Sequence, residues 1–65
     1  MSLRTFDYTM NGKSLICVFR MQDHGKFDLV EIVERPLGIS IMKEVEKTEH
    51  YGKIWREAEK KFGGA

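Results

Sequence analysis

The chain has 65 residues, of which 42% are hydrophobic and 32% are charged, and its formal net charge is +1 at pH 7. These values are typical of a soluble globular domain and exclude a disordered chain. The length allows one domain, residues 1–65, and a domain of this size buries only about 60% of its unfolded surface. The near-neutral charge argues against a protein that holds nucleic acid through its phosphate backbone.

Cysteine usage and hydropathy indicate where the protein works. Cys17 is the only cysteine, so no internal disulfide can form, and this favours a reducing compartment. The longest unbroken apolar run covers residues 15–19, which is too short for a signal-peptide core or for a membrane span. We therefore expect a cytoplasmic protein that does not contact a membrane.

The first predicted element is a β-hairpin with strands at about residues 3–10 and 13–22. Asn11-Gly12 supplies two residues that tolerate positive φ, so a two-residue turn fixes the register. In that register Phe6 pairs with Cys17. One face then collects Phe6, Tyr8, Met10, Leu15, Cys17, Phe19 and Met21, which predicts the core. The opposite face collects Thr5, Asp7, Thr9, Ser14, Ile16, Val18 and Arg20, so it is polar on the first strand and largely apolar on the second.

A third strand is predicted at about residues 26–34, after a turn at Asp23-His24-Gly25. A three-residue loop with Gly25 in the left-handed region would pair Met21 with Phe27. This register, which we favour, places Phe27, Leu29 and Val33 on the core face and Glu31 opposite Cys17. A two- or four-residue loop would place Val30 and Ile32 on the core face instead. In both cases the second face of the sheet holds at least four apolar side chains.

Proline at position 36 ends the third strand, because it donates no ladder hydrogen bond. Residues 37–42 alternate with a period of two and predict a short fourth strand, followed by a helix at about residues 44–62. The alternative is one helix that begins at Ser40. Gly52 interrupts the helical pattern and marks either a kink or a close contact. The apolar face of this helix is predicted to consist of Tyr51, Ile54, Trp55, Ala58 and Phe62, and residues 63–65 are predicted to be a frayed end.

The sequence therefore predicts an α+β fold, in which a three- to four-stranded antiparallel sheet, a hairpin meander, packs on one C-terminal helix. None of its motifs carries recognisable chemistry. His24, His50 and Cys17 lack the close spacing of a metal site, and no glycine-rich loop is placed to hold a phosphate. We expect no enzymatic activity, no metal and no cofactor.

Two functions remain open. The first is a small non-enzymatic interaction or regulatory protein, because one helix covers only one face of the sheet. Its expected partner is a second copy, in a homodimer or other homo-oligomer, or another protein. Its predicted interaction face contains Ile16, Val18 and Arg20, and its contact is made by this second apolar face or by an edge strand. The alternative is a nucleic-acid-binding module with a three-stranded sheet and a C-terminal helix. That module would use Arg20, Lys26, Arg35, Lys53, Arg56, Lys60 and Lys61.

Overall fold

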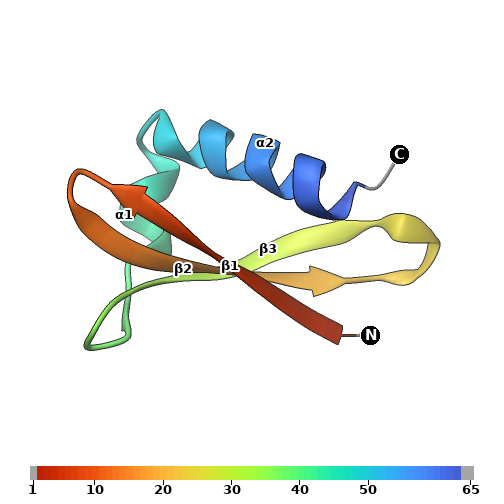
Figure 1. Cartoon of the computed structure of the whole chain (residues 1–65), viewed down its shortest axis with the longest axis horizontal. Helices are drawn as coiled ribbons and strands as arrows, with labels where there is room; N and C mark the ends of the chain where they lie inside the picture. The colour runs from red at the N-terminus through yellow and green to blue at the C-terminus, as the bar shows by residue number, and fades with distance from the viewer. Residues whose placement is uncertain (1, 64–65) are drawn as a thin grey trace.

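A four-stranded antiparallel sheet and two helices make up the computed structural model, which describes residues 2–63 (Figure 1). The strands follow one another in the sheet in chain order: β1 (Ser2–Met10), β2 (Lys13–Met21), β3 (Phe27–Glu34) and β4 (Ile39–Ser40). They are followed by α1 (Met42–Glu46) and α2 (His50–Phe62), and α2 lies along one side of the sheet. The predicted α+β class and the antiparallel meander are confirmed. Most of the predicted frayed end, residues 64–65, lies outside the described residues.

The β1–β2 hairpin has the predicted turn and register. Asn11 and Gly12 both adopt positive φ, 51° and 79°, as a two-residue turn between twisted strands requires. Phe6 lies opposite Cys17 and Tyr8 lies opposite Leu15. The core face of the hairpin is therefore the one that the alternation of side chains indicates.

The connection from β2 to β3 is the predicted three-residue loop. Met21 lies opposite Phe27, and the Gln22 N–H donates to the Lys26 carbonyl oxygen at 2.7 Å, which closes the loop. Gly25 has the expected positive φ, 76°, and the φ of His24 is also positive, 66°. The loop therefore matches its prediction.

The register of β3 changes in the middle of the strand, which the sequence analysis did not anticipate. Leu29 lies opposite Phe19, but Glu31 rather than Val30 lies opposite Val18, so a β-bulge places two residues against one. Past the bulge, Ile32 faces the core opposite Cys17. The prediction that Val33 faces the core and that Glu31 lies opposite Cys17 is therefore wrong. The bulge removes the conflict, because it keeps the Glu31 carboxylate out of the apolar interior.

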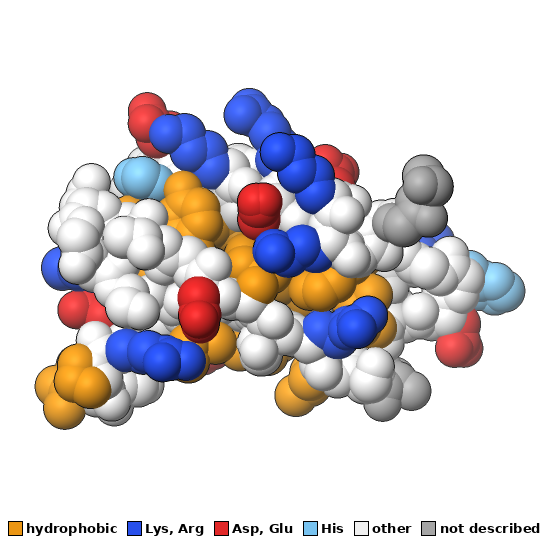
Figure 2. Space-filling view, viewed as in Figure 1, with side chains coloured by type: hydrophobic (Ala, Val, Ile, Leu, Met, Phe, Trp, Pro, Cys, Tyr) orange, Lys and Arg blue, Asp and Glu red, His pale blue; other side chains and the backbone are white. Residues whose placement is uncertain are grey.

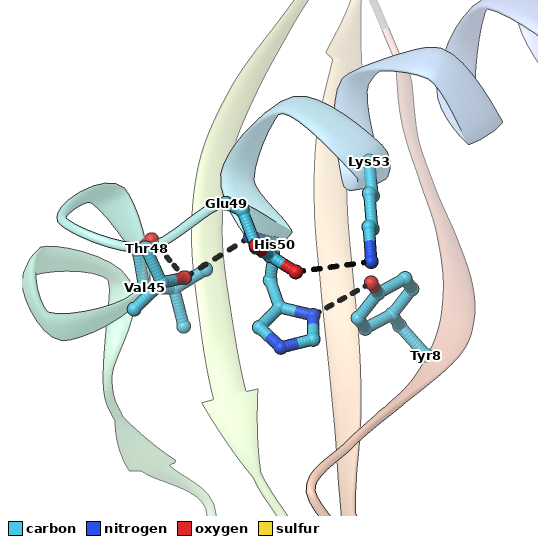
Figure 3. A network of polar contacts seen from close by, with 6 residues as sticks. All are labelled: Tyr8, Val45, Thr48, Glu49, His50 and Lys53. Carbon is cyan, nitrogen blue, oxygen red and sulfur yellow. Dashed lines mark hydrogen bonds and ion pairs between the residues drawn. The ribbon is translucent and has the colours of Figure 1, made fainter.

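The segment after β3 differs from its prediction in two ways. The strand expected at residues 37–42 is only the two-residue β4, which pairs with Val33 and Glu34. The helix expected at residues 44–62 is two helices, α1 and α2, with a break at residues 47–49. Thr48 explains the break, because its hydroxyl accepts a hydrogen bond from the His50 N–H at 3.2 Å and donates one to the Val45 carbonyl oxygen at 2.9 Å (Figure 3). Its side chain caps the start of α2 and favours a new helix at that point.

The core lies between the sheet and the helices. Its buried members are Phe6, Leu15, Cys17, Phe19, Leu29, Ile32, Val45, Ile54 and Ala58. Phe19 is fully buried at the centre, and its ring lies 5.3 Å from that of Trp55 and 5.5 Å from that of Phe62, both in edge-to-face geometry. Aromatic pairs at these separations contribute about 0.5–1.5 kcal/mol each beyond their buried area. The predicted apolar face of the C-terminal helix is thus the surface that closes the core.

Gly52 lies within α2, is exposed, and is neither a kink nor a close contact. A methyl group added at this position would meet no atom within 4 Å. We predict that Gly52→Ala raises the free energy of unfolding by about 0.5–1 kcal/mol, because alanine loses less backbone entropy in a helix. Urea unfolding followed by circular dichroism measures this. The matched control is Gly12→Ala, which we expect to destabilise the protein because Gly12 has positive φ. A loss of stability in Gly52→Ala would contradict the prediction.

Candidate interaction face

The sheet surface turned away from α2 carries an apolar centre, and we call this surface the open face. Ile16 and Val18 on β2 and Val33 on β3 form the centre, and each is only half-buried. Val30, beside the bulge, is 37% exposed, and Leu3 on β1 is 65% exposed. None of these five residues belongs to the core cluster. Aliphatic side chains thus face solvent across the middle of the sheet.

The helices have no apolar side chains left to cover the open face. Every apolar residue of the two helices packs on the core side: Met42, Val45, Tyr51, Ile54, Trp55, Ala58 and Phe62. Figure 1 shows α2 and the sheet as two layers, one above the other, with no helix of the described residues on the other side of the sheet. Within residues 2–63, the fold therefore has two layers, and the open face is the outer surface of one of them.

Charged side chains surround the apolar centre, and most are paired within the chain. Arg20 lies 3.8 Å from Asp28, which also accepts a hydrogen bond from the Gln22 side-chain amide. The Arg35 guanidinium lies 3.5 Å from the Asp7 carboxylate, so this pair reaches across β2 from the residue that follows β3 to β1. Such exposed pairs add little stability. Their main effect is on the charge of the surface, because paired charges leave the rim of the open face with little net charge.

Glu31 occupies the rim on the β4 side of the open face. Its carboxylate accepts hydrogen bonds from the Ser40 hydroxyl at 2.7 Å and from the Ile32 N–H at 3.0 Å. A shallow depression of about 300 Å³ adjoins it, lined by Val30, Glu31, Ser40, Met42, Lys43 and Glu46. A second one, of about 340 Å³, lies by the β2–β3 loop at Gln22, Asp23, His24 and Lys26. Both have the smallest volumes usual for small-molecule sites and lie open to solvent.

The three residues predicted for the interaction face lie together on this surface. Ile16 and Val18 are in its centre, while Arg20 is at the rim and paired with Asp28. The favoured register already placed Val30 on this face, but it placed Val33 in the core and Ile32 on the open face. The bulge exchanges these two residues, because it changes the alternation of β3 past Val30. The available signal was the apolar character of both Leu29 and Ile32, which a regular strand cannot place on one face.

Cys17 lies on the core side with no exposed surface. Burial, with a smaller contribution from the Asp7 carboxylate, raises the pKa of its thiol from 9.0 to about 12. Burial and a raised pKa both disfavour the thiolate, which is the nucleophilic form of cysteine. In the part of the chain that the structure describes, His, Cys, Asp and Glu form no group of three or more that would hold a metal ion.

His50 has a structural contact that the sequence did not indicate. Its Nδ1 lies 2.9 Å from the Tyr8 hydroxyl, and the two rings meet edge to face at 5.8 Å (Figure 3). Glu49 and Lys53 form an i,i+4 ion pair beside it, at 3.3 Å. The first turn of α2 is thereby attached to β1.

The fold and its open face define a small two-layer α+β protein whose sheet is covered on one side. No family model matches the sequence, and neither curated proteins nor solved structures provide a significant match. Among residues 2–63, neither helix has the length and apolar character that crossing a membrane requires. The functional argument therefore rests on the surface described above.

The Cys17 thiol provides the first prediction from this region. Because its pKa is about 12 in the folded protein and near 9.0 when exposed, the folded state holds the proton more tightly between these values. The free energy of unfolding should therefore fall as pH rises from about 9 towards 12, by on the order of 1 kcal/mol per pH unit. Urea unfolding at pH 8 and pH 10 measures this, with Cys17→Ala as the control that lacks the effect. An equal fall in both proteins would contradict it.

The second prediction concerns the hydrogen bond between Tyr8 and His50. Tyr8→Phe keeps the ring and removes the hydroxyl, so we expect it to lower the free energy of unfolding by about 1 kcal/mol. The matched control is Tyr51→Phe, since Tyr51 is also half-buried against the core and its hydroxyl makes no hydrogen bond within residues 2–63. Equal effects of the two substitutions on urea unfolding would contradict a role for the hydrogen bond.

Proposed function

We propose that this protein is a small non-enzymatic interaction protein with a regulatory role, which associates with itself through the open face. The observation that carries the proposal is the uncovered aliphatic centre at Ile16, Val18 and Val33. Burial of apolar surface contributes about 25 cal/mol per Å² to stability. Exposure of these side chains to water therefore loses several kcal/mol of stabilising free energy. This is comparable with the total stability of a small domain.

A second copy fits this surface better than a strongly charged partner does. The centre consists of β-branched side chains on a sheet, and sheet faces of this kind stack on another sheet at about 10 Å. The rim charges are Asp7, Asp28, Glu31, Arg20 and Arg35, of which four form two ion pairs within the chain. An apolar centre with a nearly neutral polar rim is the arrangement of protein–protein interfaces, and it does not repel its own copy.

The alternative, a nucleic-acid-binding module, has less support from the charges. The open face carries three carboxylates against two arginines, and on α2 Glu57 and Glu59 alternate with the basic residues. Lys53 is also paired with Glu49. Binding to mixed DNA or RNA that falls steeply with salt would favour this alternative.

Sedimentation equilibrium from low to high micromolar concentration tests self-association. We expect the native chain to form oligomers, and Val18→Lys to reduce the mass of the assembly because the lysine charge would have to be buried at the contact. The control is Leu37→Lys, which makes the same kind of change at a side chain that is 79% exposed in the turn before β4. A strictly monomeric native protein, or an assembly that Val18→Lys and Leu37→Lys affect equally, would contradict the proposal.

A further inference from the structure

The long free edge of the sheet is β1. The strand order leaves β1 and β4 at the two edges, and β4 has only two residues whereas β1 has nine. The bulge lies in β3 and the only proline is at position 36, so β1 contains neither a bulge nor a proline, which are two of the features that protect an edge. Figure 1 shows β1 crossing in front of the other strands, with nothing in front of it.

The ladder determines which backbone groups of β1 point outward. The Ser14 carbonyl oxygen accepts a hydrogen bond from the Arg35 N–H at 2.9 Å, so the Ser14 backbone faces away from β1. Thr9, which lies opposite Ser14, therefore directs its own N–H and C=O to the free edge. By alternation Leu3, Thr5 and Asp7 do the same. Within residues 2–63, none of these four residues makes a backbone hydrogen bond outside the strand ladder.

We propose that β1 pairs antiparallel with β1 of a second copy, about a two-fold axis at Phe6, to form one continuous eight-stranded sheet. The inference rests on the proposed self-association and specifies its geometry. Thr5 then lies opposite Asp7 of the second copy, and Leu3 lies opposite Thr9 of the second copy. All four outward-facing residues of each strand are hydrogen-bonded, and the pairing uses all nine residues of β1.

The charges and length of β1 select this register over its neighbours. Moving the axis to Asp7 would place two Asp7 carboxylates opposite each other, which is destabilising. Moving it to Thr5 would leave Thr9 and Met10 without partners among residues 2–63. With the axis at Phe6, the Thr5 hydroxyl meets an Asp7 carboxylate, and Arg4 lies opposite the Tyr8 ring of the second copy, where a cation attracts the ring face.

The surface around β1 also suits such a partner. Figure 2, in the view of Figure 1, shows a band of apolar side chains between α2 and the sheet, bordered by basic and acidic side chains. Lys61 lies over the Phe6 ring at 5.8 Å, and Arg4 lies over the Phe62 ring at 5.7 Å. A two-fold axis normal to the sheet keeps both α2 helices on one side. The two apolar bands then meet and shield each other from water.

Edge pairing also makes the open face large enough for a stable contact. Three long strands of eight or nine residues present roughly 400 Å² of sheet, whereas a standard interface buries about 800 Å² per partner. Two copies joined along β1 present roughly 800 Å² on one side. The open faces of two such sheets can then stack, so that four copies form a closed sandwich.

Sedimentation equilibrium of variants tests this geometry. We expect Val18→Lys to prevent stacking of the open faces and to leave a dimer held by β1. We expect the double variant Val18→Lys/Thr5→Pro to be a monomer, because proline at position 5 removes an N–H that points to the free edge and leaves the hydrogen bonds to β2 intact. In the Val18→Lys protein, Thr5→Asp should raise the dimer Kd about tenfold and Thr5→Lys should lower it, because both face Asp7 of the second copy. Thr9→Asp and Thr9→Lys, opposite Leu3, are the matched controls.

The outcomes separate this inference from the proposed function. A Val18→Lys protein that is monomeric while the native chain is oligomeric would overturn the β1 pairing and leave the open-face contact intact. Equal effects of Thr5→Asp and Thr5→Lys on the dimer Kd would overturn the register. A native chain that is monomeric at all concentrations would overturn both. A dimer in Val18→Lys with opposite effects of the two Thr5 charges supports the β1 pairing.

Discussion

The rest of the structure depends on the packing around Phe19. This side chain has no exposed surface, and four aromatic rings, those of Phe6, Phe27, Trp55 and Phe62, lie within 6 Å of its own. The rings come from three strands and α2, so a single cluster fixes the sheet to its helix. A 65-residue chain without disulfides has few other means of stabilising a fold.

The apolar side chains of the helices all pack in the core. The two candidate contact surfaces, the open face and the β1 edge, follow from that. A second layer over the sheet would require another amphipathic element, and within residues 2–63 the chain has none. The sheet therefore keeps Ile16, Val18 and Val33 on its outer side, and it keeps β1 as a long unprotected edge. Both features have the same origin, namely a sheet that is larger than the helices that cover it.

Local chemistry made much of the fold predictable from sequence. Asn11 and Gly12 determine the first hairpin, and the spacing of the α2 residues identifies the helical face of the core. The bulge in β3 could not be predicted in the same way, because a bulge changes which residues face the core part-way along the strand, and no turn residue marks its position. The break before α2 depends on hydrogen bonds of the Thr48 hydroxyl, and the Tyr8–His50 contact joins residues far apart in the chain. Ile16 and Val18 were placed correctly because they lie on the strand whose register the turn fixes.

The two-residue turn at Asn11 and Gly12 has a consequence far from its own position. Turn length determines the phase of the β1 ladder, and the phase decides whether the amides available at the edge belong to the odd or the even residues. With two residues, the exposed amides belong to residues whose side chains are mostly threonine and aspartate, and the aromatic residues hold the hairpin together. The turn thus determines which backbone groups of β1 are free to pair with another strand and which ones bond to β2.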